Sequence, residues 1–199
     1  FTASPGSRVL ADLPPLPPRT QLAQMPSDER KFYIYNTTRT NAHRQNPLVR
    51  LLKDEGLWGR GSADKFIPAF VFHQPDAEIA YLLRHLWHCD GTIHPLGRTA
   101  GYVSISKHLA DDVKYLLWTL GIYASAHETD GRCGFTGKTI HAYRVSVTGG
   151  TFDRFQAMIE GRDFATISTP LRGVPGKIVS IEPVAAETVY CLTIGHDSH

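Results

Sequence analysis

The chain has 199 residues, and 21 lysines and arginines against 19 aspartates and glutamates give it a formal net charge of +2 at pH 7. Hydrophobic residues make up 42% of it and charged residues 20%, which is typical of a globular chain and excludes disorder over the whole length. No stretch approaches the roughly 18 consecutive apolar residues of a membrane-spanning helix, so we expect no membrane partner. Cys89, Cys133 and Cys191 include no Cys-x-x-Cys pair, which argues against a disulfide framework or a four-ligand zinc site and favours a reducing, cytoplasmic location.

The N-terminal part of the chain divides into a proline-rich stretch and a stretch with regular patterns. Residues 1–30 are rich in proline and show little periodicity, so we expect a linker there. The segment Phe32–Tyr35 is typical of a short strand. Asn46 followed by Pro47 predicts a capped helix, which ends at Gly56.

Further along the chain, helical and strand patterns alternate. Apolar residues three and four apart predict a helix from Asp76 to Asp90, which Gly91 ends. The next predicted elements are strand 102–106, helix 111–120, strands 122–128 and 141–148 joined by a glycine-rich loop at 129–139, helix 151–159, and strands 177–182 and 188–194. The sequence therefore predicts an α+β fold.

One spacing occurs twice in the chain. A Leu-Leu pair is followed by a glycine and then by an apolar residue in both Leu51-Leu52-x-x-x-Gly56-Leu57 and Leu116-Leu117-x-x-x-Gly121-Ile122. Because a glycine commonly ends a helix, either copy alone is a weak pattern. Together they indicate an internal structural repeat.

Three segments resemble known proteins. The run Leu82-Leu-Arg-His-Leu-Trp-His-Cys-Asp-Gly91 resembles the apolar, Asp-Gly-ending helix of LAGLIDADG (dodecapeptide, DOD-type) homing endonucleases, and its Leu-Arg-His-Leu-Trp string is most like inteins in bacterial replicative DNA helicases. The run Lys65-Phe-Ile-Pro68 resembles the Lys-x-Ile-Pro segment between the two such helices of inteins. The runs 177–182 and 189–194 resemble the strand pair near the C-terminus of an intein. Their order and spacing extend the resemblance over about residues 31–199.

The resemblance implies a fold and a domain division. LAGLIDADG endonucleases contain two αββαββα repeats that form a pseudo-symmetric saddle on double-stranded DNA. Here residues 76–165 correspond to a whole second repeat, and 31–75 to the tail of the first repeat with the inter-repeat segment. Residues 176–199 correspond to the start of the β-rich C-terminal splicing (Hint) segment. We therefore expect a fragment whose intramolecular partners are the rest of the first repeat and the N-terminal splicing half.

The resemblance also implies a metal site at Asp90. Phosphodiester hydrolysis uses a divalent cation, here Mg²⁺, held by carboxylates to activate water and neutralise charge. A carboxylate is unfavourable at a helix C-terminus and needs a reason for being there. The alternative interpretation is an exposed aspartate with no ligand. His85 departs from the family pattern, which has a small residue at this position so that the two helices pack closely.

The resemblance further implies a lysine near the cleavage centre and a DNA-reading sheet. Lys65 matches the lysine that lies near the attacking water, although a solvated loop lysine is the alternative. Strand alternation predicts Ser104 and Ser106 on one polar face and Arg144 and Ser146 on another, which would lie in the major groove. Arg132 and Lys138, from the loop, would join them. Taken singly, each of these residues could also be an ordinary exposed residue.

Cys191 matches a position that most inteins fill with Asp. In class 3 inteins this position is a cysteine that acts as the first nucleophile at the N-terminal splice junction, and a thiolate suits acyl transfer. A cysteine packed in a strand is the alternative. The sequence thus predicts an intein fragment whose longer parent cuts double-stranded DNA with Mg²⁺ and splices, while the fragment alone does neither. A non-cutting LAGLIDADG-like transcription regulator and a domain with no DNA role are the rival hypotheses.

Overall fold

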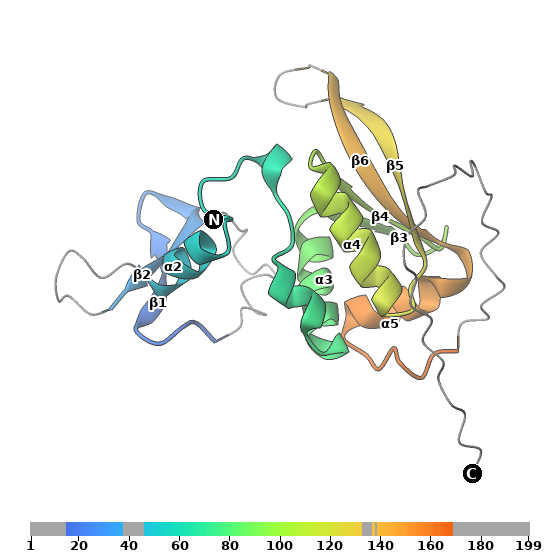
Figure 1. Ribbon diagram of the computed structural model, residues 1–199, viewed down its shortest axis with the longest axis horizontal. Coiled ribbons are helices and arrows are strands. Elements are labelled where there is room, and N and C mark those ends of the chain that lie inside the picture. Colours follow the sequence, from blue (N-terminus) through green and yellow to red (C-terminus); the bar gives the residue numbers. More distant parts are fainter. Residues whose placement is uncertain (1–14, 38–45, 133–136, 138, 169–199) are drawn as a thin grey trace, which may run out of the picture.

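The computed structural model describes residues 15–37, 46–132, 137 and 139–168 (Figure 1). Its first part is a hairpin followed by a helix: β1 (Thr20–Met25), β2 (Asp28–Asn36) and α2 (Pro47–Asp54). Two short 3-10 helices, η1 (Ser62–Asp64) and η2 (Ala69–His73), lead into the second part. That part consists of α3 (Asp76–Asp90), β3 (Gly91–His94), β4 (Thr99–Ser104), α4 (Lys107–Thr119), β5 (Ala124–Arg132), β6 (Thr139–Thr148), η3 (Gly149–Thr151) and α5 (Phe152–Glu160).

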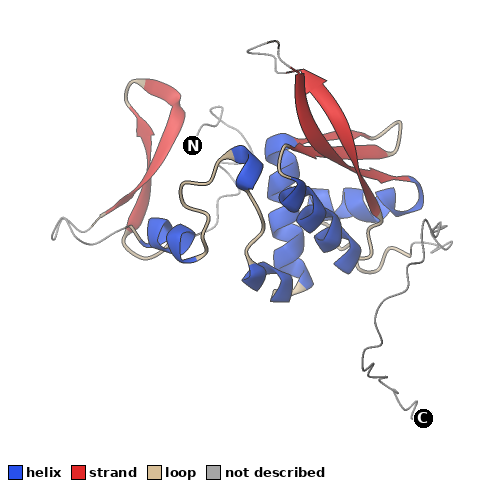
Figure 2. Ribbon diagram, turned by 45° about the horizontal axis from the view of Figure 1, so that its top comes forward, coloured by secondary structure: helices blue, strands red, loops and turns tan. Residues whose placement is uncertain are grey.

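The second part has the order αββαββα, which confirms the predicted α+β class. Its four strands form one antiparallel sheet in the order β3-β4-β6-β5. The three helices α3, α4 and α5 lie against one face of this sheet, and no described element covers the other face (Figure 2). No helix in the described part of the chain combines the length and the apolar composition that crossing a bilayer requires.

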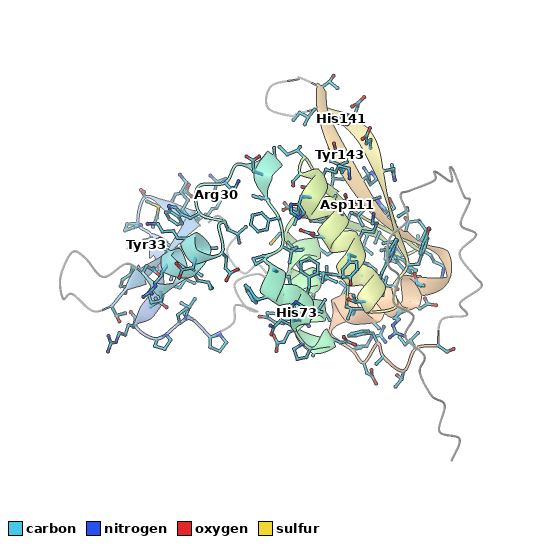
Figure 3. All side chains as sticks on the ribbon, in the orientation of Figure 1. Arg30, Tyr33, His73, Asp111, His141 and Tyr143 are labelled. Carbon is cyan, nitrogen blue, oxygen red and sulfur yellow. The ribbon has the colours of Figure 1, made fainter. Side chains whose placement is uncertain are left out.

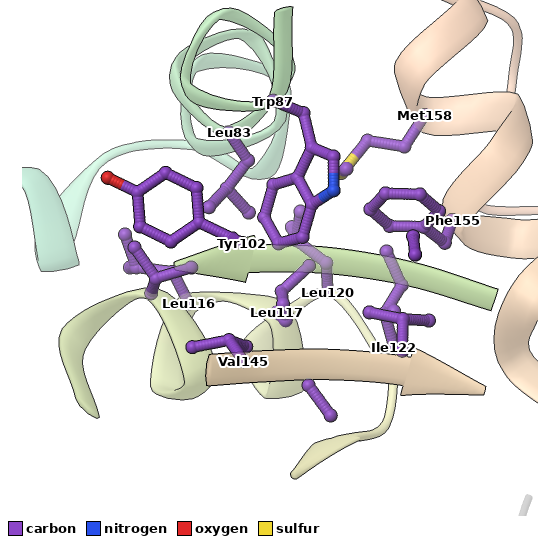
Figure 4. Close-up of a cluster of buried hydrophobic side chains, with 14 of the residues drawn as sticks. Leu83, Trp87, Tyr102, Leu116, Leu117, Leu120, Ile122, Val145, Phe155 and Met158 are labelled. Carbon is purple, nitrogen blue, oxygen red and sulfur yellow. The ribbon is translucent and has the colours of Figure 1, made fainter. Parts of the chain in front are cut away.

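The core lies between the sheet and the three helices (Figure 4). Leu83 and Trp87 of α3 are buried one helical turn apart, as the predicted spacing requires. The Trp87 ring lies 5.1 Å from the Phe155 ring and 5.5 Å from the Tyr102 ring, measured between centroids. Val145 of the central strand β6 completes the layer from the sheet side. Burial of these large side chains fixes α3 on the sheet and thereby fixes where its last residue lies.

Helix ends explain the repeated Leu-Leu-Gly spacing. Gly56 and Gly121 both adopt a left-handed conformation, with φ of 69° and 68°. The residue after each glycine donates its N–H to the second leucine of the pair, with 2.8 Å from Leu57 N to Leu52 O and 2.9 Å from Ile122 N to Leu117 O. Both helices therefore end in the same Schellman motif. The hairpin β1–β2 followed by α2 also repeats the order of β3-β4-α4 and β5-β6-α5, as an internal repeat would.

Several predicted bounds are correct and others are wrong. The helix Asp76–Asp90 is confirmed residue for residue, and Asn46 caps α2 by accepting from Leu48 N at 2.9 Å. The linker expected over 1–30 is wrong for residues 20–30, because Pro26 occupies the two-residue turn of a hairpin instead of breaking a strand. The strand expected at 102–106 runs from Thr99 to Ser104, and β3 was not predicted. The strands expected at 177–182 and 188–194 lie outside the described residues.

Candidate nucleic-acid interface

We call the side of the sheet that faces away from α3, α4 and α5 the outer face. Paired residues in an antiparallel ladder point to the same side, so the register assigns its members. They are Thr92, His94, Thr99, Gly101, Val103, Ser125, His127, Thr129, Gly131, Ile140, Ala142, Arg144, Ser146 and Thr148. These described positions include no aspartate or glutamate. The outer face can therefore approach a polyanion without like-charge repulsion from its own side chains.

The acidic residues of the same strands point to the opposite side. Glu128 and Asp130 of β5 share the helix-facing side with His141 and Tyr143 of β6. This part of the hairpin projects beyond the N-terminus of α4, where His141 and Tyr143 lie side by side along β6 (Figure 3). His141 Nδ1 lies 3.0 Å from Asp130 Oδ1, and the hydrogen bond to Asp130, then the charge of Glu128, raises the pKa of His141. The carboxylates are thus engaged away from the outer face.

Arg144 lies at the centre of the outer face. Its strand neighbours are Val103 on one side and His127 on the other. A Cβ built on Gly101 would lie 3.0 Å from Arg144 Nη1 and 3.2 Å from Thr92 Oγ1, so the glycine leaves the room that the guanidinium occupies. None of the ion pairs among the described residues involves Arg144. Its charge is available to an external anion.

The structure does not place Ser104 and Ser106 on this face, so their predicted position on a polar strand face is wrong. Ser104 pairs with Tyr143 on the helix-facing side, and its hydroxyl accepts a hydrogen bond from the Ser106 amide at 3.0 Å. Ser106 follows β4, is 1% exposed and caps α4. The alternation of polar and apolar residues predicts the wrong solvent-facing side for this strand, because Tyr102 packs in the core while Val103 and Ile105 are exposed. Ser146 is correctly expected on the outer face, between Gly101 and Ser125.

Ser106 instead positions the segment that carries Lys65. Its hydroxyl donates to the Lys65 carbonyl oxygen at 2.6 Å and accepts from Leu109 N at 3.1 Å. Two residues on, Ile67 N donates to Asp112 Oδ2 at 2.8 Å, which is a second tie to α4. Lys65 itself is exposed. The sequence alone does not reveal these two contacts, because their partners lie 41 and 45 residues apart in the chain.

A shallow cavity of about 470 Å³ lies beside Lys65 at the N-terminal end of α4. Arg60, Phe66, Lys107 and His108 line it, together with Asp64. The Phe66 and His108 rings stack 5.6 Å apart, and the Arg60 guanidinium lies 6.0 Å from the Phe66 centroid. This is a basic, partly aromatic surface that adjoins the end of the sheet.

Asp90 is the last residue of α3 and is exposed. The next residue, Gly91, begins β3 and pairs with Tyr102, while Lys65 contacts Ser106 just past the end of β4. Asp90 and Lys65 therefore lie toward the same end of β4. Burial, and then the negative charge of Asp90, raises the pKa of the Tyr102 phenol to about 12.

Position 91 requires glycine because a side chain there would have no room, and not because of its backbone angles. Its φ of −90° and ψ of 160° are extended and suit any residue. A Cβ at this position would collide with the Cα and indole ring of Trp87. The tight approach allows the chain to leave α3 and enter β3 directly, and this holds Asp90 at the edge of the sheet.

The described residues supply Asp90 as a lone carboxylate ligand. No group of three or more His, Cys, Asp or Glu side chains that could hold a metal ion occurs among them. Asp90 fits Mg²⁺ in donor chemistry, since this ion takes one or two protein carboxylates and fills its other positions with water or phosphate.

Lys138 and Cys191 lie outside the described residues. Arg132 ends β5, opposite Thr139.

Comparison with known proteins agrees with this geometry. Residues 77–160, which span α3 to α5, match the family model described as the LAGLIDADG-like domain. This part of the chain is a LAGLIDADG-like domain.

Three relatives of the chain are replicative DNA helicases named DnaB. It is 35% identical over 131 residues to the replicative DNA helicase DnaB of Synechocystis sp. and 36% identical over 131 residues to that of Nostoc sp.. It is 40% identical over 86 residues to the replicative DNA helicase DnaB of Rhodothermus marinus. These matches cover 62%, 62% and 41% of this chain but 15%, 14% and 9% of the relatives. The chain thus spans about 15% or less of the length of these helicases, and both findings are consistent with an intein in a DnaB.

The LAGLIDADG-like domain also shows which candidate residues sequence reasoning missed. Thr92, Val103 and His127 lie on the outer face next to Arg144 or its guanidinium. Thr92 lies in β3, which was not predicted, and Val103 lies in the strand expected at 102–106, of which only Ser104 and Ser106 were singled out. His127 alternates with Ala124 and Ala126 in β5, so its exposure could have been found from the pattern of that strand.

Proposed function

We propose that the LAGLIDADG-like domain belongs to the homing endonuclease of an intein in a DnaB-type helicase. In the longer protein it binds double-stranded DNA on the outer face and makes a Mg²⁺-dependent double-strand cut. The observation that carries this proposal is the outer face itself, which has Arg144 at its centre and no described carboxylate, while the exposed Asp90 ends α3 next to the edge strand β3. Ser146 and Lys138 would add contacts to the phosphates or base edges, whereas the ladder position of Arg132, opposite Thr139, falls on the other side of the sheet.

Asp90 would hold the metal ion. A bound Mg²⁺ would neutralise charge on the scissile phosphate and lower the pKa of an attacking water. Asp90 offers one carboxylate, so a second acidic group outside the described residues would complete the site. This agrees with the proposal that residues 31–75 are only the tail of a first repeat, whose own Asp-bearing helix would supply that group. Lys65, tied to α4 through Ser106, would lie close enough to that end to polarise the water.

The test is cleavage by the longer protein that contains this chain. Asp90→Asn should abolish Mg²⁺-dependent cutting and leave DNA affinity within about threefold, because the outer face is unchanged. Glu78→Gln is the matched control, since Glu78 is exposed on the same helix at its other end. If the wild-type protein binds DNA without cutting it, the domain is a non-cutting DNA-binding module. Unchanged cutting by the Asp90→Asn variant would show that the catalytic assignment is wrong.

Cys191 is proposed as the nucleophile of the splicing module. Its Sγ thiolate would attack the carbonyl carbon at the N-terminal splice junction, and the bond to the departing backbone nitrogen would break as that nitrogen takes a proton. A thioester would then link the upstream segment to Cys191. Cys191→Ala in the longer protein should remove the trapped thioester and stop splicing, whereas Cys133→Ala should not. Splicing that persists after Cys191→Ala would contradict this role.

A further inference from the structure

Val103 is an exposed aliphatic side chain in the middle of a polar face. It is 39% exposed although it lies in β4, which has a hydrogen-bonded neighbour on each side. Because β4 is a central strand, Val103 does not protect a sheet edge. The residues that β4 contributes to the core are Ala100 and Tyr102. The Val103 side chain therefore lies on the outer face and does not pack against the helices.

The neighbouring arginine leaves Val103 open. Arg144 is directly opposite Val103 in the ladder, but its Nη1 would lie 3.0 Å from a Cβ built on Gly101, in the adjacent row of the outer face. The guanidinium therefore extends over Gly101 and away from the valine. Arg144 and Val103 present two different chemistries to one ligand, a planar pair of donors and a branched methyl surface.

Base edges in the major groove match these two chemistries. Arginine forms a bidentate pair with O6 and N7 of guanine, and the 5-methyl group of thymine is the apolar group on a base edge. Alternate residues of a strand are about 7 Å apart, which is about two base steps in B-DNA. A guanine contacted over Gly101 and a thymine contacted by Val103 would therefore lie one or two base pairs apart.

We infer that Val103 contacts the 5-methyl group of a thymine and sets a preference for a T·A pair within about two base pairs of the guanine contacted by Arg144. This inference rests on the proposed function, because it requires that DNA occupies the outer face. It adds a specificity-determining residue that strand alternation alone did not single out.

The experiment uses the 199-residue chain and duplexes that differ by single methyl groups. Selection from a randomised duplex library first defines the preferred site. Each thymine of that site is then replaced by deoxyuridine, which removes the 5-methyl group and keeps every hydrogen-bonding atom. At one thymine the wild-type chain should bind the deoxyuridine duplex about fourfold more weakly, the effect of one buried methyl group. Val103→Ser should remove this difference, and Val103→Thr, which keeps one methyl group, should retain part of it.

Ser62→Ala is the control, because Ser62 is exposed in η1 and does not belong to the outer face. It should discriminate thymine from deoxyuridine as the wild type does. If the chain binds DNA but Val103→Ser discriminates like the wild type, the inference about Val103 is overturned and the proposed function stands. If the chain retains no duplex at low salt, DNA binding by the outer face fails as well. Equal melting temperatures for the two Val103 variants show that neither result comes from unfolding.

Discussion

The Ser106 hydroxyl joins Lys65 to the first turn of α4. It donates to the Lys65 carbonyl oxygen at 2.6 Å and accepts from Leu109 N at 3.1 Å while being almost fully buried. One side chain thus both caps the helix and orders the segment that carries the candidate catalytic lysine. Ser106 therefore does not lie on the polar strand face that alternation predicts for it.

Removing that hydroxyl should cost stability. Ser106→Ala leaves the Leu109 amide and the Lys65 carbonyl without this partner, so we expect the free energy of unfolding to fall by about 1–2 kcal/mol. Urea unfolding followed by circular dichroism measures the change. Ser125→Ala, at an exposed position, should change it by less than about 0.5 kcal/mol. Equal effects of the two substitutions would contradict the capping role.

Gly91 should be intolerant of any side chain. The methyl group of Gly91→Ala would enter the space of Trp87, so the indole or the α3–β3 connection must move, at a cost of about 1–3 kcal/mol. Gly97→Ala is the matched control in the turn after β3, since its nearest atoms would be 3.7 Å away. Thermal unfolding of both variants tests this. A Gly97→Ala variant that is as unstable as Gly91→Ala would show that spacing is not the reason.

The pairing of His141 predicts a pH dependence. Its pKa is raised above 6.5, first by the hydrogen bond to Asp130 and then by Glu128, so the folded state holds the protonated ring more tightly than the unfolded state does. The resulting stabilisation is fully present below pH 6.5 and is lost as the pH rises through the folded-state pKa. An NMR titration should give His141 a pKa above 6.5.

Asp130→Asn should lower the pKa of His141 more than Glu128→Gln does, because the Asp130 contact is the larger cause. The same titration measures both variants. If Glu128→Gln has the larger effect, or if the wild-type ring titrates below 6.5, the hydrogen bond at Asp130 is not what holds the proton.

Local patterns predicted α3 well because the information for this helix is contiguous, whereas α4, expected at 111–120, begins four residues earlier at Lys107. The spacing of Ile79, Leu83 and Trp87 defines one face, and Gly91 marks the end, so α3 was predicted residue for residue. The Leu-Leu-Gly spacing was likewise predictive because a Schellman motif is made within a few residues. The αββαββα order followed from the family resemblance, because the local patterns did not predict β3.

The sides of β4 could not be predicted in the same way. Tyr102, Ser104 and Ser106 alternate with Val103 and Ile105, and hydrophobicity favours burying the aliphatic pair. Tyr102 is buried instead because Trp87, from a distant part of the chain, packs on its ring. Ser106 is buried because Lys65 and Leu109 satisfy its hydroxyl. Both causes depend on contacts between segments that the local pattern does not contain.

The central claim is that the outer face, with Arg144 at its centre, binds double-stranded DNA. The most direct measurement is the affinity of the chain for duplex DNA as a function of salt concentration, for the wild type, Arg144→Ala and Arg162→Ala. Arg162 is an exposed arginine that follows α5 on the helix side and pairs with Glu160. We predict that log affinity falls linearly with log salt, that Arg144→Ala weakens binding about tenfold at fixed salt, and that Arg162→Ala changes it by less than twofold. Binding that is insensitive to salt, or an equal loss from the two substitutions, would contradict the account.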